Sequence, residues 1–109
     1  MGTGAEDRTS ELIAAVHLAI EFLRTYDRNS WADRFEESLA DIENGESRGT
    51  ARLIGLFGGM GSVNDIWISA GNGDRIGAAN EGSVNQRLRG LLGDVYEPAN
   101  QIEHDVSTQ

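Results

Sequence analysis

The chain has 109 residues, 18 acidic and nine basic side chains, a formal net charge of −9 and no cysteine. This length fits one domain, and the absence of cysteine excludes disulfides and thiolate metal sites. All nine basic residues are arginines, which excludes Schiff-base lysine chemistry and the P-loop lysine, while the acidic balance argues against nucleic acid or an anionic membrane as a partner.

The ends of the chain are polar. Residues 1–7 lack the basic start and the apolar stretch of a signal peptide. No apolar run approaches the roughly 18 residues that cross a bilayer. We therefore expect a cytoplasmic protein with a disordered tail over residues 1–8, one globular domain over 9–104 and a second tail over 105–109.

The first predicted helix runs from Thr9 or Ser10 to about Tyr26. Its apolar side chains recur at helical spacing and form a broad stripe, which indicates a helix covered on more than one side. The stripe consists of Leu12, Ile13, Val16, Ala19, Ile20, Phe22, Leu23 and Tyr26. His17 is interpreted as a partly buried packing residue, because it lies next to Val16 and Leu18 on this helix. The other histidine, His104, lies in a polar segment near the end of the chain.

A second helix is predicted from a capping residue at Ser30 to a stop at Asn44 and Gly45. Its face opposite the apolar residues carries five carboxylates, which we call the acidic face: Asp33, Glu36, Glu37, Asp41 and Glu43. From Asp33 to Glu46 six acids and one arginine give a net charge of −5. This face is either a solvated helix surface or a docking surface for a basic protein.

A third helix is predicted from about Arg48 to Phe57. The β-branched and aromatic residues from Val63 to Ile68 then favour a strand, and the Asn-Gly pair at residues 72–73 favours a hairpin turn with a weak returning strand over 75–78. Trp67 is interpreted either as a core or rim anchor or as an interface hot spot.

The last helix is predicted to begin after a cap at Asn80 and to kink or break near Glu97, because Pro98 lacks a backbone donor, with a last helical piece over residues 99–103. Gly90 and Gly93 within it suggest that another element packs closely there. The expected fold class is therefore α+β and mainly helical, with about four helices and a small β-hairpin or short strand in the glycine-rich middle.

The glycine-rich stretch is the most distinctive part of the sequence, and two interpretations stay open. In the first, glycines end the third helix and permit a left-handed turn, while polar side chains hold the next element. In the second, the backbone amides cradle an anion or small ligand, although the spacing matches neither a dinucleotide fingerprint nor a P-loop. The residues concerned are Gly58, Gly59, Gly61, Ser62, Asn64 and Asp65.

No catalytic pattern is found in the sequence. No serine lies in a nucleophile elbow, the two histidines do not form a Glu-x-x-His pair, and carboxylates on an exposed helix face keep ordinary pKa values. We therefore expect a protein that is not an enzyme and that has no catalytic residue, no cofactor and no metal.

Residues 56–68 read Leu-Phe-Gly-Gly-Met-Gly-Ser-Val-Asn-Asp-Ile-Trp-Ile. This stretch resembles a Phe-Gly-Gly-Met-Gly-Ser-x-Asn-Asp signature of small uncharacterised bacterial proteins that contain a domain of unknown function. The resemblance covers residues 50–103 in layout and Gly58 to Asp65 in letters. It implies a helix, a short strand, a polar turn and a final amphipathic helix, and it assigns no catalytic residue. Many small acidic proteins of this kind are encoded beside toxin genes as immunity proteins.

Two functions are therefore considered as hypotheses. The first is a protein-binding module, an immunity protein that covers the basic active site of a bacterial toxin domain with its acidic face and Trp67. The second is a small regulatory or ligand-binding domain that uses the loop from Gly58 to Asp65.

Overall fold

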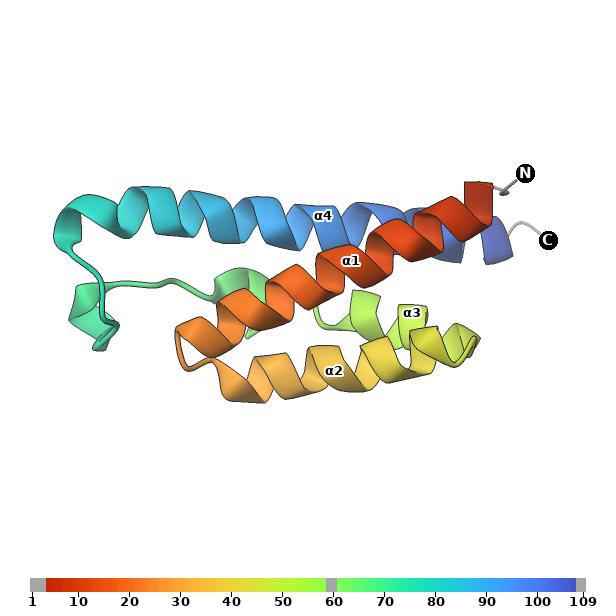
Figure 1. The fold of residues 1–109 in the computed structure, drawn as a ribbon, viewed down its shortest axis with the longest axis horizontal. Helices are drawn as coiled ribbons and strands as arrows, with labels where there is room; N and C mark the ends of the chain where they lie inside the picture. Colours follow the sequence, from red (N-terminus) through yellow and green to blue (C-terminus); the bar gives the residue numbers. More distant parts are fainter. Residues whose placement is uncertain (1–3, 59–60, 108–109) are drawn as a thin grey trace.

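Four α-helices make up most of the part of the chain that the structure describes, residues 4–58 and 61–107 of a computed structural model (Figure 1). Between the third and fourth helices lie three single-turn 3-10 helices. In chain order the elements are α1 (Gly4–Thr25), α2 (Asn29–Glu43), α3 (Ser47–Gly55), η1 (Val63–Asp65), η2 (Ala70–Asn72), η3 (Ala78–Asn80) and α4 (Glu81–Ser107).

The helices enclose one apolar core. α1 packs against both α2 and α4, and the short α3 contacts α2 and α4. Figure 1 shows α1 and α4 side by side, with the start of α1 and the end of α4 at the same end of the molecule. An ion pair between Arg8 and Asp105 joins the two helices there.

Every long helix contributes side chains to this core, and so does the extended segment after η1. Leu12, Val16 and Leu23 on α1 are fully buried, which confirms the predicted broad stripe. His17, in contrast, is exposed, so the prediction of a partly buried packing residue is wrong. The largest fully buried side chains outside α1 are Phe35, Leu53, Val63, Ile68, Asn85, Leu88 and Val95.

The helix ends differ from the sequence-based expectations in several places. α1 begins at Gly4, ahead of the expected cap at Thr9 or Ser10, and α3 ends at Gly55 rather than at Phe57. α2 is preceded by Arg28, whose side chain does not cap it, and Ser30 lies inside its first turn. α4 begins directly after Asn80, as predicted.

Of the predicted kink or break near Glu97, the break is wrong, because α4 continues through Pro98 to Ser107. Val95 and Ala99, on either side of the proline, are fully buried. Burial of both halves of the helix against the core offsets the hydrogen bond that proline removes. The expected close packing at Gly90 and Gly93 is also wrong, since a Cβ atom added at either would meet no atom within 4 Å.

The α+β prediction is wrong as well. Within residues 4–58 and 61–107 there is no β-strand, and residues 75–79 form no returning strand. Residues 66–69 are extended, and burial alternates along them: Ile66 and Ile68 are buried and Trp67 is exposed. The period of two that indicates a strand is therefore present, but the segment has no neighbouring strand in the described chain.

Side chains from α4 supply the hydrogen bonds that a neighbouring strand would supply. The Asn85 side-chain amide accepts from the Ile68 N–H and donates to the Ile68 carbonyl, both at 2.8 Å. One turn further along α4, the Arg89 guanidinium donates to the carbonyls of Asn64 and Ile66. Because buried backbone groups must be paired, these two side chains allow the extended segment to lie on a helix.

Candidate functional site

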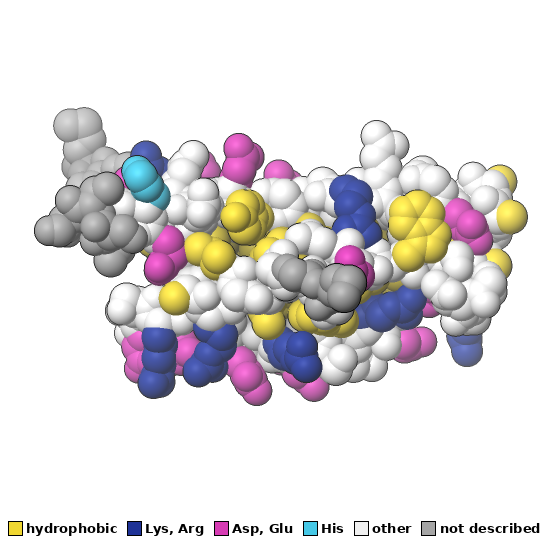
Figure 2. Space-filling view, turned by 180° about the vertical axis from the view of Figure 1, so that it is seen from behind, with side chains coloured by type: hydrophobic (Ala, Val, Ile, Leu, Met, Phe, Trp, Pro, Cys, Tyr) yellow, Lys and Arg dark blue, Asp and Glu magenta, His cyan; other side chains and the backbone are white. Residues whose placement is uncertain are grey.

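The acidic face of α2 lies where the sequence predicts it, but arginines from other helices contact much of it. Arg24 of α1 forms ion pairs with Asp33 at 2.8 Å and Glu36 at 3.0 Å. Arg48 and Arg52 approach Asp41 within 3.6 Å and 3.5 Å. Figure 2 shows the result along its lower edge, where dark blue and magenta side chains alternate.

These contacts change how the face should be interpreted. The side chain of Asp41 is only 15 % exposed, so it is a poor candidate for direct contact with a partner. Glu37 and Glu43 are exposed and have no ion pair within 4 Å in the part of the chain that the structure describes. The net charge of −5 in the sequence is therefore reduced in space, and two carboxylates of the acidic face stay free.

Trp67 is the most exposed of the large apolar side chains that the structure describes, with 52 % of its surface accessible. Its two neighbours in the chain are buried, and its own carbonyl accepts hydrogen bonds from Arg28 at 3.3 Å and from Asn72 at 3.2 Å. The backbone is held on both sides of the residue while the indole faces solvent. This exposure excludes a core position for Trp67, whereas a rim anchor and an interface hot spot both agree with it.

A buried carboxylate that the sequence analysis missed fixes this arrangement. Both terminal nitrogens of Arg28 donate to Asp74, each at 2.9 Å, and the Ser69 N–H donates to the same carboxylate at 2.9 Å. The Asp74 side chain is only 6 % exposed. Hydrogen bonds from Arg28 hold the pKa of Asp74 below its ordinary value, in opposition to burial. We call residues 66–74, which these bonds hold in place, the Trp67 segment.

The position of Arg28 places the Trp67 segment in the molecule. Arg28 immediately precedes α2, so the segment lies beside the first residues of that helix, and Glu43 lies at the other end. A helix of 15 residues is about 22 Å long at 1.5 Å per residue. Trp67 lies in a segment beside the start of α2 and Glu43 is the last residue of that helix, so these groups are spread along the molecule and do not line a single cavity.

The Arg28–Asp74 pair predicts a pH-dependent stability. A carboxylate whose pKa is lowered in the folded state stabilises that state fully above its unfolded pKa of about 3.9, and the contribution is lost as the pH falls through the lower folded value. We expect Asp74→Asn to lower the free energy of unfolding by about 1–3 kcal/mol at pH 7. In urea denaturation, the difference in the free energy of unfolding between this variant and the parent chain should become smaller below pH 4.

The control is Asp7→Asn, at an exposed carboxylate with no ion pair within 4 Å in the described residues. It should leave the free energy of unfolding unchanged at both pH 7 and pH 3. If the free energy of unfolding of Asp74→Asn differs from that of the parent chain by the same amount at pH 7 and at pH 3, the ionised carboxylate does not have this role.

The glycine-rich turn is held mainly by its own side chains. Gly61 has a φ of +73°, the left-handed conformation expected for it. Its N–H donates to Asp65 at 2.6 Å, and the Asn64 N–H donates to the hydroxyl of Ser62 at 3.3 Å. Gly58 is exposed, and Gly59 lies outside the described residues. Two of the amides that would cradle a ligand are thus already bonded, which favours the structural interpretation of this turn.

Metal-binding clusters and membrane-spanning helices are both absent from the described residues. Among the side chains that the structure describes, those of residues 7–58 and 61–105, no group of three or more His, Asp or Glu is arranged to hold a metal ion. None of the helices in those ranges has the length and apolar character needed to cross a membrane.

A domain of unknown function, DUF6966, covers residues 24–77. The matched range contains Arg24, α2, α3, the glycine-rich turn and the Trp67 segment, and it leaves out most of α1 and all of α4. The match confirms the expected domain of unknown function, whereas the signature and the likeness to bacterial immunity proteins stay predictions. No curated protein and no solved structure was found to match the chain.

Proposed function

We propose that this chain is a protein-binding module whose central contact is Trp67. The observation that carries the proposal is an exposed indole on a backbone held by Arg28, Asn72, Asn85 and Arg89. Tryptophan is enriched among the residues that dominate binding energy at protein interfaces. A segment that is already ordered loses little conformational entropy on binding, so more of the contact energy contributes to affinity.

The partner in this proposal is a basic protein. A net charge of −9 attracts a positively charged surface over distances of about a Debye length, roughly 8 Å at physiological salt. Glu37 and Glu43 contribute directly, because no arginine in the described chain neutralises them. The role of α2 is then to speed association, while Trp67 slows dissociation.

In its most specific form, the proposal is that the partner is a bacterial toxin domain and that this chain is its immunity protein. The Trp67 segment and the free carboxylates of α2 would cover a basic active-site cleft and exclude its substrate. The length of the chain, its acidic charge and the exposed tryptophan support this form of the proposal. Co-expression with the product of the neighbouring gene tests it directly.

We expect Trp67→Ala to weaken binding of that partner by about 30-fold or more, which corresponds to a hot-spot loss of at least about 2 kcal/mol. Trp67→Phe, which keeps an aromatic ring, should lose less. Titration calorimetry on the purified pair measures both. An unchanged affinity of the Trp67→Ala variant would overturn the proposed contact.

Two charge reversals test whether the carboxylates of α2 speed association with the partner. Glu37→Arg should lower the association rate several-fold at low salt and lose its effect as salt rises, whereas Asp7→Arg, with the same change in net charge, should have a smaller effect. Stopped-flow mixing measures both rates. If the neighbouring gene product is not toxic, or if this chain neither binds it nor rescues growth, the immunity form is wrong.

A further inference from the structure

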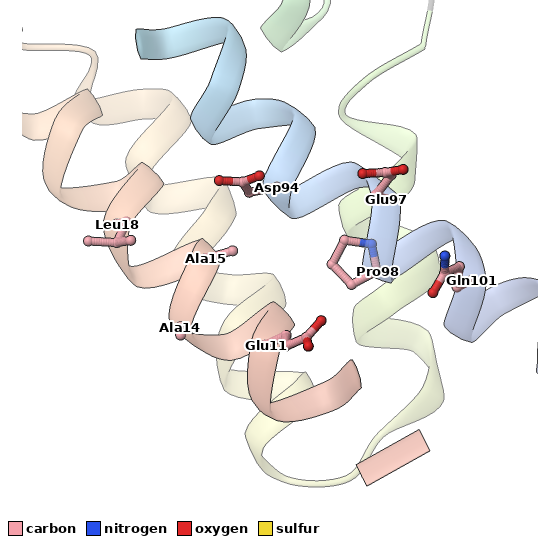
Figure 3. A pocket seen from close by; sticks show the side chains of 8 residues that line it. All are labelled: Glu11, Ala14, Ala15, Leu18, Asp94, Glu97, Pro98 and Gln101. Atoms are coloured by element: carbon pink, nitrogen blue, oxygen red, sulfur yellow. The ribbon is translucent and has the colours of Figure 1, made fainter. Parts of the chain in front are cut away.

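A groove between α1 and α4 forms a second surface that the proposed function does not use. The larger of its two hollows has a volume of about 460 Å³ and is lined by Glu11, Ala14, Ala15, Leu18, Asp94, Glu97, Pro98 and Gln101. Figure 3 shows the floor, where Ala15 of α1 and Pro98 of α4 lie between the two helices. We call this surface the α1/α4 groove.

The rim of the groove is acidic. Glu11 lies on the α1 side, and Asp94 and Glu97 lie one turn apart on the α4 side (Figure 3). All three are exposed, and no guanidinium lies within 4 Å of them among residues 4–58 and 61–107. These carboxylates differ from Asp33, Glu36 and Asp41 of α2, which have arginine partners.

The groove continues along the helix pair. Leu18, which is 49 % exposed, lines both the larger hollow and a second one of about 270 Å³ toward Tyr26 and Val84. The lining residues on α1 recur every three or four positions from Glu11 to Thr25, so the groove follows the helix axis. At a rise of 1.5 Å per residue this range spans about 21 Å, the length of a helix of about 14 residues.

We infer that the α1/α4 groove binds a basic amphipathic helix of a partner protein. The floor accepts apolar side chains at helical spacing, which is the helix-in-groove mode of peptide recognition. The three rim carboxylates would pair with lysine or arginine side chains that flank the apolar stripe of that helix. This inference goes beyond the proposed function, because neither Trp67 nor the acidic face of α2 takes part in it.

The charges of the groove disfavour a second copy of this chain as the occupant. The two hollows are lined by four carboxylates and one guanidinium, those of Glu11, Glu21, Asp94, Glu97 and Arg87. Pairing two such grooves would bring eight carboxylates together with two guanidinium groups, between chains that each have a net charge of −9. Like charges at an interface are unfavourable, whereas a cationic helix is complementary.

The test uses a synthetic 14-residue peptide with leucines at helical spacing and lysines on both flanks. We expect it to bind the full chain, and the amide shifts in NMR spectra should change along the facing sides of α1 and α4. A peptide with glutamates in place of the lysines should not bind. Shift changes centred on the Trp67 segment or on α2, or no binding of the lysine peptide, would overturn the inference.

Matched variants separate the groove from general charge attraction. The double variant Asp94→Arg, Glu97→Arg should lower the affinity for the lysine peptide about tenfold or more. The double variant Glu37→Arg, Glu43→Arg makes the same change in net charge on α2 and should lower this affinity less than about threefold. Ala14→Trp narrows the groove at an exposed position without changing its charge, and it should also weaken binding. Equal losses from both double reversals, or a stable dimer of the chain alone in sedimentation, would contradict the inference.

Discussion

Asn85→Ala is expected to lower the free energy of unfolding by about 3–4 kcal/mol, as measured by chemical denaturation. The Asn85 side chain is 2 % exposed and is hydrogen-bonded to the N–H and the carbonyl of Ile68, each at 2.8 Å. Alanine leaves two buried backbone groups unpaired, and each unsatisfied group costs about 1–3 kcal/mol. This is a large part of the roughly 5–15 kcal/mol that stabilises a domain of this size.

The control for this variant is Asn72→Ala. Its side-chain amide also donates to a carbonyl of the Trp67 segment, at 3.2 Å, but at an exposed position where water replaces it. We expect a loss below about 1 kcal/mol. A loss for Asn85→Ala as small as that for Asn72→Ala would show that Asn85 does not hold the extended segment.

Gly49→Ala is also expected to have a large effect and to lower the free energy of unfolding by about 2 kcal/mol, again measured by chemical denaturation. A Cβ atom at Gly49 would lie 2.8 Å from the Asp41 Cβ and the Ile42 backbone nitrogen, and 2.9 Å from the Ile42 Cγ1. Since one of these atoms belongs to the backbone of α2, α3 must move away from α2. Overpacking of this kind costs about 1–3 kcal/mol, more than the alanine gains in helix propensity.

Gly90→Ala is the matched control, because it adds the same methyl group inside α4 at a site with no atom within 4 Å. It should stabilise the chain by about 0.5–1 kcal/mol through helix propensity alone. The two substitutions therefore have opposite expected signs. If both raise the free energy of unfolding, α2 and α3 are not in close contact at Gly49.

The helices were predictable because their signal is local. Apolar spacing identifies α1, α2 and α4, and the fully buried Leu12, Phe35 and Leu88 lie on the predicted faces. The end of α4 was not predictable, since the effect of Pro98 depends on how deeply the residues around it are buried in the core. That packing is a property of the tertiary structure.

The hairpin shows why a correct pattern can lead to a wrong element. Residues 66–68 do alternate between buried and exposed, as in a strand, but Asn85 and Arg89 supply the hydrogen bonds. Asn85 lies 17 residues beyond Ile68, and Arg89 lies 23 residues beyond Ile66. Nothing in the local sequence distinguishes an extended segment held by side chains from one held by a sheet.

The candidate site, too, was predictable only where its signal is local in the sequence. The sequence identifies the carboxylates of α2 and names Trp67, but it does not reveal that Arg24 neutralises Asp33 or that Arg28 binds Asp74, 46 residues away. These pairs form only when α1, α2 and the Trp67 segment come together. The α1/α4 groove was missed for the same reason, because its rim combines residues from both ends of the chain.

The contacts of Arg28 and Arg89 show what arginine contributes to the structure of this chain, which contains no lysine. Each of these guanidinium groups bonds several acceptors at once: Arg28 bonds Asp74 and the carbonyls of Tyr26 and Trp67, and Arg89 bonds two carbonyls. The planar fork of arginine suits such bridging, whereas the lysine ammonium acts as a point charge. Reagents that modify side-chain amines therefore leave these contacts intact, while guanidinium-directed reagents such as phenylglyoxal act on the groups that hold Trp67 in place.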